Sequence, residues 1–363
     1  MTRTKEIFIQ LIRLGTGHSE SIEVTNDEGW EEVKILAEQQ GLSAIMLDGI
    51  ERLKSSKVQD VQGPPQEFLF EWIGETLQDE SLYSLQGEVA KDVAKLFYRN
   101  GIKMYVLKGT VVSECYPKPQ HRVSVDIDCF LLPLKGDFDA WSLGNDLIRN
   151  KGFHVNTDFY KNSSFDVSGV SIENHQYLTP FRGNKRLIAL EKKLQELIRQ
   201  DRGEDIIEGT CMYRPPVMVT ALFLIEHAYS HFLHEGLTWR HVLDWMMFSR
   251  KHEKEIDWKQ LEAWIDEFGF RSFYNTYFLL GQLLFGEIEV SRLTKQDHMM
   301  LRDIWADLDV HETVRGFKGK LALAGNTWRA RWKYRYFSED SMLKALWIQA
   351  KGVLFEKNPS LNI

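Results

Sequence analysis

The change in hydrophobic period along the chain constrains the fold more than any other feature. Short strand-like runs occur only between Ile102 and about Tyr177, where they alternate with helix-like runs. On either side, apolar residues recur at helical spacing, as from Leu82 to Tyr98 and around Leu261. Strands that alternate with helices over short connections favour a small mixed sheet covered by helices, so we expect an α+β fold.

This pattern predicts three parts. They are a helical N-terminal segment over residues 1–100, an α/β core over 101–180 and a larger helical C-terminal domain over 181–363. A hydrophobic share of 43% is enough to bury a core and excludes wholesale disorder. A net charge of −7 argues against a protein whose whole surface coats nucleic acid.

Cysteine usage and the N-terminal residues point to one compartment. Cys115, Cys129 and Cys211 are too few and too scattered for a disulfide framework or a CxxC zinc site, and they fit a reducing environment. The first residues predict a helix and not a signal peptide, because Gln10 and Arg13 interrupt the apolar stretch. No apolar run approaches the ~18 residues that a membrane span needs. We therefore expect a cytoplasmic protein without a transmembrane segment.

Two aspartates two positions apart carry the strongest chemical signal. Asp126 and Asp128 lie in the predicted strand VDIDCFLL, so their side chains point to one face while Ile127 and Cys129 point to the other. Two carboxylates held this close repel each other unless a cation lies between them. Hard oxygen ligands in this arrangement suit Mg²⁺, which in enzymes bridges carboxylates and substrate phosphates. The alternative is a solvated strand edge without a metal.

Polar residues before and after these aspartates fit the same chemistry. Gly109 and Thr110 lie where a predicted buried strand turns into a helix, and free backbone N–H groups there favour an anion. Lys108 and the Thr110 hydroxyl add donors for a phosphate. Glu173 lies in VSIENHQYL, a strand that can pair beside the aspartates, and a third carboxylate there would complete a two-metal site. Asp166 competes with Glu173 for this role.

Taken in order, these motifs resemble a known family. The segments LKGT, HRVSVDID, IENH, EHAYSH and RHVLDW are similar to the signature of the uncharacterised bacterial nucleotidyltransferase family, within the polymerase-β-type nucleotidyltransferase superfamily. The resemblance runs from the N-terminal helices to about residue 250. Two differences from the superfamily pattern are Thr110, where serine or glycine is usual, and a long spacing between Gly109 and Asp126.

The resemblance implies a fold and a set of roles. On a small nucleotidyltransferase-type sheet, Gly109 and Thr110 would hold a triphosphate, and Asp126 and Asp128 would bind the metals. Glu173 would be the third metal ligand and would orient or deprotonate an acceptor hydroxyl. The implied reaction transfers an NMP group from an NTP, taken as ATP, to an unidentified hydroxyl acceptor with release of pyrophosphate. The implied cofactor is Mg²⁺ or Mn²⁺.

Two cations extend this predicted nucleotide site. Lys108 and Arg122 are candidates for phosphate contacts, and a surface or salt-bridging role is the alternative for each. A nucleotidyltransferase is the favoured function. A non-catalytic nucleotide- or partner-binding module on the same fold is the alternative to an enzyme.

Four histidines gather in EHAYSHFLHEGLTWRHVLDW. His227 and His231 are four apart and share a helix face, which is the spacing of half a zinc site. The run lacks the glutamate of an HExxH motif, and a structural pair at a helix contact is the favoured interpretation. The resemblance adds another, in which His175, His227, His231, Arg240 and Asp244 line the acceptor pocket. Asp244 would then orient Arg240 or a histidine.

Residues 315–335 contain the largest charge asymmetry, with lysines and arginines, interleaved aromatic residues and no acidic residue. Trp328 and Trp332 are one helical turn apart, so core packing with the basic side chains reaching outward is the favoured interpretation. An RNA-binding adaptor that stacks bases on the aromatic residues is an alternative, and an anionic membrane surface is another. Nucleic acid is therefore not the favoured partner.

Overall fold

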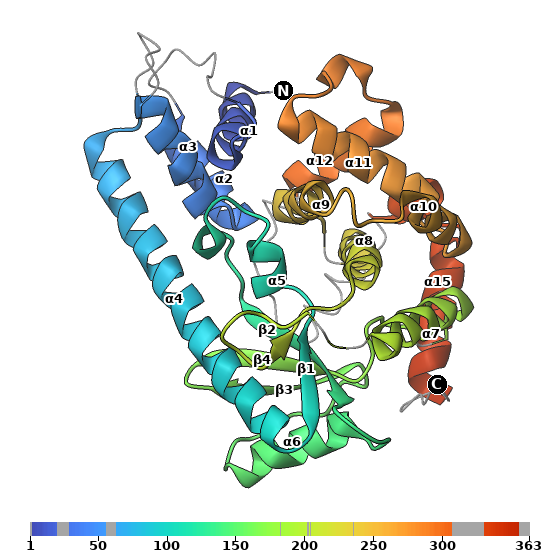
Figure 1. Ribbon diagram of the computed structural model, residues 1–363. Helices are drawn as coiled ribbons and strands as arrows, with labels where there is room; N and C mark the ends of the chain where they lie inside the picture. The colour runs from blue at the N-terminus through green and yellow to red at the C-terminus, as the bar shows by residue number, and fades with distance from the viewer. Residues whose placement is uncertain are drawn as a thin grey trace.

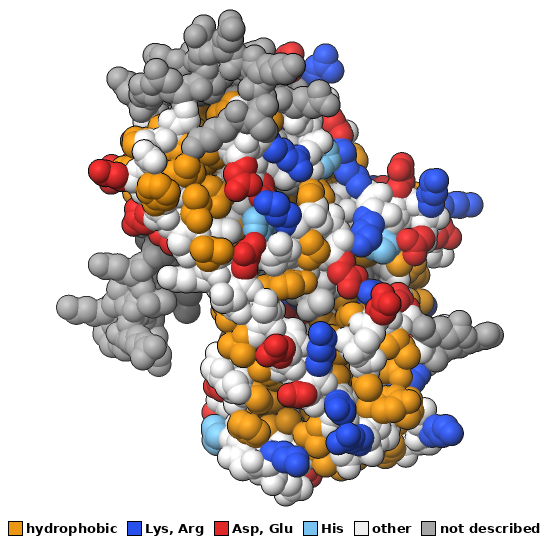
Figure 2. Space-filling view, turned by 60° about the vertical axis from the view of Figure 1, so that its left-hand side comes forward, with side chains coloured by type: hydrophobic (Ala, Val, Ile, Leu, Met, Phe, Trp, Pro, Cys, Tyr) orange, Lys and Arg blue, Asp and Glu red, His pale blue; other side chains and the backbone are white. Residues whose placement is uncertain are grey.

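The structure is a computed structural model, and it describes residues 2–19, 29–55, 63–181, 183–201, 203, 205–234, 236–306 and 330–355. A small mixed sheet lies against helices from both ends of the chain, which confirms the expected α+β class (Figure 1). No helix among these residues is long and apolar enough to cross a membrane. On the face shown in Figure 2, acidic and basic side chains are intermixed, with small hydrophobic groups between them.

Helices form the N-terminal part, as the apolar spacing predicts. They are α1 (Arg3–Thr16), α2 (Trp30–Gln40), α3 (Ser43–Ser55) and α4 (Gln66–Arg99). α1 and α3 pack with their backbones in contact, because a Cβ on Gly15 would overlap the carbonyl oxygen of Ile45 and a Cβ on Gly49 would overlap that of Leu11. Gly41 ends α2 in the left-handed region.

In the described residues the sheet has the strand order β3-β4-β2-β1-β5. The strands are β1 (Ile102–Val106), β2 (Asp126–Pro133), β3 (Asn162–Val167), β4 (Val170–His175) and β5 (Met212–Tyr213). β2 pairs antiparallel with β1 and parallel with β4, so the sheet is mixed. β3 pairs antiparallel with β4, and β5 pairs parallel with β1. The fifth strand therefore comes from beyond the predicted core boundary at residue 180.

Two short runs between the strands form little regular structure. The run FHVN does not form a strand, and there Asn156 makes only a single bridge with Ser164. This run is too short and too polar at its end to be buried on a sheet. The run VVSECY forms only the one-turn helix α5 (Thr110–Ser113), because the prolines that follow prevent its continuation. A short 3₁₀ helix, η1 (Pro119–His121), lies between α5 and β2.

The two faces of the sheet pack against different parts of the chain, because successive residues of a strand point to opposite sides. One face, which carries Met104, Ile127 and Ile172, packs on the C-terminal half of α4 and on α6 (Ala140–Asn150). The other face, with Tyr105 and Phe130, belongs to the larger core shared with the helices at both ends of the chain. Helices from both ends of the chain therefore cover this second face.

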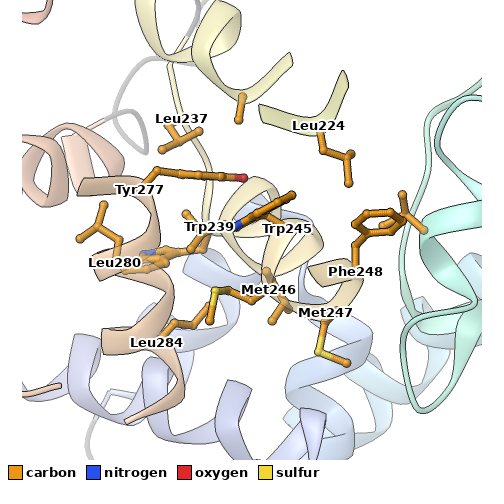
Figure 3. Close-up of a cluster of buried hydrophobic side chains, with 14 of the residues drawn as sticks. Leu224, Leu237, Trp239, Trp245, Met246, Met247, Phe248, Tyr277, Leu280 and Leu284 are labelled. Atoms are coloured by element: carbon orange, nitrogen blue, oxygen red, sulfur yellow. The ribbon is translucent and has the colours of Figure 1, made fainter. Parts of the chain in front are cut away.

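The C-terminal part is helical, as expected. Its elements are α7 (Lys185–Gln200), α8 (Val217–His234), α9 (Trp239–Lys251), α10 (Trp258–Glu267), α11 (Arg271–Phe285), η2 (Val290–Arg292), α12 (Lys295–Ala306), α14 (Arg331–Phe337) and α15 (Met342–Phe355). Figure 3 shows Trp239 and Trp245 of α9 between Leu224 of α8 and Tyr277 and Leu280 of α11. This packing fixes the position and rotation of α9.

The basic segment 315–335 lies only partly in the described part of the chain, and Trp328 is outside it. Within α14, Lys333 is buried and donates to the carbonyl oxygen of Phe232 at 2.7 Å. The Trp332 ring meets the Phe232 ring edge to face. The described end of the segment therefore packs into the core with Arg331 and Arg335 exposed, as the favoured interpretation expects, but Lys333 is buried and does not reach outward.

Candidate active site

The parallel pairing of β2 with β4 brings three carboxylates to one face of the sheet. Asp128 lies directly opposite Glu173, and Asp126 lies two residues earlier on the same face. Residues paired in this way have side chains on the same side of a sheet. Asp166 is exposed on the outer strand β3, pairs with Ser171, and does not line the cavity described below. The structure therefore brings Glu173, and not Asp166, beside the aspartates.

Asp128 is the most enclosed of these acids, with 2% of its surface exposed. Its Oδ1 lies 2.9 Å from His175 Nε2. Its Oδ2 has no hydrogen bond of regular geometry, although Lys108 Nζ lies 3.0 Å away. Burial alone would raise the pKa of Asp128, but the charges of Lys108 and His175 outweigh burial and hold that pKa below its ordinary value.

The other two acids are more open and titrate differently. Burial, and then repulsion by Asp128, raises the pKa of Asp126. A hydrogen bond from His175, whose Nε2 lies 3.5 Å from Glu173 Oε2, lowers the pKa of Glu173. Ligand atoms of Asp128, Glu173 and His175 lie within 4.8 Å of one another. This group contains His175 in place of Asp126. The sequence predicts Asp126 as a metal ligand, and the family resemblance places His175 in the acceptor pocket.

A cavity of about 620 Å³ opens above this face of the sheet. Its size is in the range of small-molecule sites. Its walls come from β2, β4, α8, α9 and the segment before β2. Of the sequence-predicted residues, it is lined by Lys108, Arg122, Asp126, Asp128, Glu173, His175, His227, His231, Arg240 and Asp244. A single cavity therefore joins the predicted metal site to the predicted acceptor pocket.

Gly109 and Thr110 are the predicted residues that lie beside this cavity without lining it. Gly109 has a φ of 58°, and a Cβ on it would lie 3.5 Å from Ser124 Oγ, so its turn runs alongside the start of β2. A positive φ here favours glycine. A helix N-terminus at this turn was expected to favour a bound anion. The helix α5 has a single turn, so its dipole is small and adds little to anion binding. Triphosphate binding by Gly109 and Thr110 stays a prediction.

Arg122 and Asp244 form a buried ion pair in another wall. Nε and Nη2 of Arg122 lie 3.1 and 2.7 Å from the two carboxylate oxygens, and the Tyr116 hydroxyl donates to Oδ1 at 2.6 Å. The salt-bridging alternative thus describes Arg122. Asp244 bonds directly to Arg122 and Tyr116, and its expected role in orienting Arg240 or a histidine stays a prediction. Arg240 donates to the Val123 carbonyl at 3.3 Å, and burial and repulsion by Arg122 lower its pKa.

The histidines of α8 and α9 form the wall opposite the sheet. His227 and His231 share a face of α8, as predicted, and their ring centroids are 4.4 Å apart. His241, from the first turn of α9, joins them, and one ligand nitrogen of each lies within 4.8 Å of the others. The sequence places His241 in the same helix pair but gives it no role. Its proximity depends on how the two helices pack, which spacing along the chain does not reveal.

Two more charged residues line the cavity without having been predicted to do so. Lys161 lies in the irregular segment before β3, where the sequence carries no signal for it. Glu226 is buried on α8, and burial raises its pKa to about 7, opposed by Lys161. Glu226 directly precedes His227, and adjacent helix residues lie about 100° apart, so the spacing that identifies the histidine face gives no signal for this residue.

Comparison with known families gives one match. A family model described as an uncharacterised nucleotidyltransferase matches residues 26–286, which include the whole described sheet and the cavity. Comparison with curated proteins and with solved structures finds no match. The family match agrees with the order of motifs on β1, β2, β4, α8 and α9, and it extends past residue 250 to the end of α11. The chain therefore belongs to the uncharacterised nucleotidyltransferase family.

Proposed function

We propose that the protein is a metal-dependent nucleotidyltransferase that moves an NMP group from an NTP, taken as ATP, to a hydroxyl of an acceptor and releases pyrophosphate. Membership of the family supports a general nucleotidyltransferase activity. The observation that carries the finer proposal is the placement of Asp126, Asp128 and Glu173 on one sheet face, under a cavity of about 620 Å³.

The donor set of this site fits Mg²⁺ or Mn²⁺. Asp126, Asp128 and Glu173 offer hard oxygen atoms, and Asp128 Oδ2 is buried without a regular hydrogen bond. These three residues would hold the ion. When bound, it would supply positive charge to the phosphates and to the attacking and leaving oxygens. Lys108 beside Asp128 supports the same conclusion, since this position already pairs with a cation.

The protein's own groups have separable roles. His175 and Lys108 hold Asp128 ionised and fix its direction. Glu173 is more exposed and has a lowered pKa, which suits it to orienting an acceptor hydroxyl better than to removing its proton. Arg240 and Lys161 add positive charge to the cavity for a polyphosphate, while Gly109 and Thr110 are proposed to contact it from the adjoining turn.

The substitution Asp126→Asn tests the site, because it replaces a proposed metal-binding carboxylate with a neutral amide. Asp126 is the less buried of the two aspartates. We expect Mg²⁺-dependent binding of ATP to weaken tenfold or more, as measured by isothermal titration calorimetry. Asp166→Asn is the matched control, since Asp166 lies exposed on the neighbouring strand outside the cavity. Unchanged MgATP binding by the Asp126 variant, or a loss confined to the Asp166 variant, would show that the site is misplaced.

A non-catalytic nucleotide-binding module on the same fold is favoured by one observation. The charge of Asp128 already faces Lys108 and its Oδ1 lies beside His175, so this charge is compensated without a metal. Release of pyrophosphate from ATP, assayed with a small-molecule cell extract as the source of acceptors, separates the two functions. The transferase predicts release that requires both Mg²⁺ and Asp126, whereas the module predicts ATP binding without release.

A further inference from the structure

Three imidazoles converge on one point of the cavity wall, away from the carboxylates. His227 and His231 come from successive turns of α8, and His241 comes from the first turn of α9. The ring centroids of His231 and His241 are 4.8 Å apart, and one ligand nitrogen of each of the three rings lies within 4.8 Å of the others. Nitrogens that share one tetrahedral ion at about 2.0 Å lie roughly 3.3 Å apart, so the three rings are near enough to meet on one ion after small side-chain rotations.

The chemistry of this donor set differs from that of the acids on the sheet. Imidazole nitrogen suits Zn²⁺ and its transition-metal neighbours, whereas Mg²⁺ prefers oxygen ligands. Three protein ligands with one position left for water or substrate is the usual composition of a catalytic zinc site. All three histidines line the cavity, so the remaining position would face its interior.

The helices hold the three rings in place. α9 is fixed by its packing against α8 and α11 (Figure 3), and Thr238 caps its first turn. His241 Nδ1 lies 2.9 Å from Thr238 Oγ1 and 3.2 Å from Thr238 N. The Thr238 backbone N–H donates to His241 Nδ1 in the capping box, so the neutral ring carries its proton on Nε2. Metal binding at Nε2 would move that proton to Nδ1, where it can donate to the Thr238 hydroxyl in place of the backbone hydrogen bond. A hydrogen bond of this kind orients most metal-bound histidines.

We propose that His227, His231 and His241 form a binding site for a transition-metal dication of the Zn²⁺ type, with its open position toward the cavity. This site replaces the interpretation of His227 and His231 as a purely structural pair, because the third histidine completes a ligand set that the pair lacks. The inference concerns metal binding alone and does not depend on nucleotide transfer.

Titration of chelator-treated, full-length protein with Co²⁺ tests the site, because tetrahedral Co²⁺ has visible d–d bands that octahedral Co²⁺ largely lacks. We expect one tightly bound ion per chain. His231→Gln and His241→Gln are expected to weaken binding a hundredfold or more, while His234→Gln, the matched control one turn further along α8, changes it less than twofold. His234 lines the cavity but is not part of the three-histidine group.

Two further measurements locate the bound ion. Glu173→Gln removes a ligand of the carboxylate group and is expected to leave Co²⁺ binding unchanged, so a loss there would assign the ion to the sheet and overturn the proposal. X-ray absorption of the Zn²⁺-loaded parent needs no variant to fold, and we expect three imidazole nitrogens at about 2.0 Å. Fewer imidazoles, or the absence of tight binding, would also overturn it.

Discussion

At the scale of single residues, two buried carboxylates beside the cavity have partners of opposite sign. Asp128 faces Lys108 and His175, and Asp244 faces Arg122. A charge removed from water is tolerated only when such a partner and its hydrogen bonds replace the lost hydration. Lys108 and Arg122 are therefore committed to acids before any substrate arrives, and a phosphate must compete with these acids for them.

The substitution Asp244→Asn tests this pairing. It leaves the buried Arg122 without a negative partner, so we expect the free energy of unfolding to fall by roughly 3–5 kcal/mol in urea denaturation. Tyr116→Phe removes one hydrogen bond to the same carboxylate and is expected to cost about 1 kcal/mol. Equal losses in the two variants would contradict a dominant role for the charge pair.

At the scale of elements, the segment between α5 and β2 is held by helices that are distant in the sequence. His121 lies 2.7 Å from an oxygen of Asp48 on α3 and 2.9 Å from an oxygen of Glu80 on α4. The Gln86 amide of α4 donates to the Ser124 carbonyl at 2.8 Å. The N-terminal helices thus determine where β2 begins, and with it the position of the aspartates.

His121 predicts a pH dependence of stability. Burial alone would lower its pKa, but Asp48 and then Glu80 raise the pKa above that of the unfolded chain. Protonated His121 therefore stabilises the fold fully below about pH 6.5, and this contribution is lost as the pH rises through the folded pKa. We expect His121→Gln to lower the unfolding free energy by about 1–3 kcal/mol at pH 6 and by less at pH 9.

The control for this measurement is His154→Gln, which changes an exposed histidine on a loop. Its unfolding free energy is expected to match the parent at both pH values. A loss in His121→Gln that is the same at pH 6 and pH 9 would show that only packing, and not protonation, stabilises the loop.

The sequence predicts this level of structure well where the signal is local. The alternation in VDIDCFLL gives the strand and the shared face of Asp126 and Asp128, and the pairing expected for Glu173 is the one observed. The partners of the buried acids Asp128 and Asp244 are less accessible to sequence analysis. His175 follows from the register of β4, but the pairing of Asp244 with Arg122 depends on how α9 packs against a loop far away in the chain.

At the scale of the whole molecule, the hydrophobic cores do not follow the predicted segment boundaries. The core on one face of the sheet combines the end of α4 with strands β1 to β4. The larger core joins α1 and α3 with Tyr105 and Phe130 of the sheet and with α8, α9 and α11. The boundaries at residues 100 and 180 remain predictions about organisation along the chain, whereas burial connects all three parts.

Shared burial predicts that the three parts unfold together, because separating them would expose apolar surface on each. We expect hydrogen exchange, followed by mass spectrometry at increasing urea, to show one midpoint for peptides from β2, α3 and α9.

Asp244→Asn is expected to lower all three midpoints equally, although it changes a contact of α9 only with the segment before β2. α15 is the internal reference, because Leu343 and Trp347 are 70% and 62% exposed and its protection is expected to be lost first. If β2 stayed protected at urea concentrations where α9 exchanges, the α/β core would fold alone. The cavity would then lie between separable units.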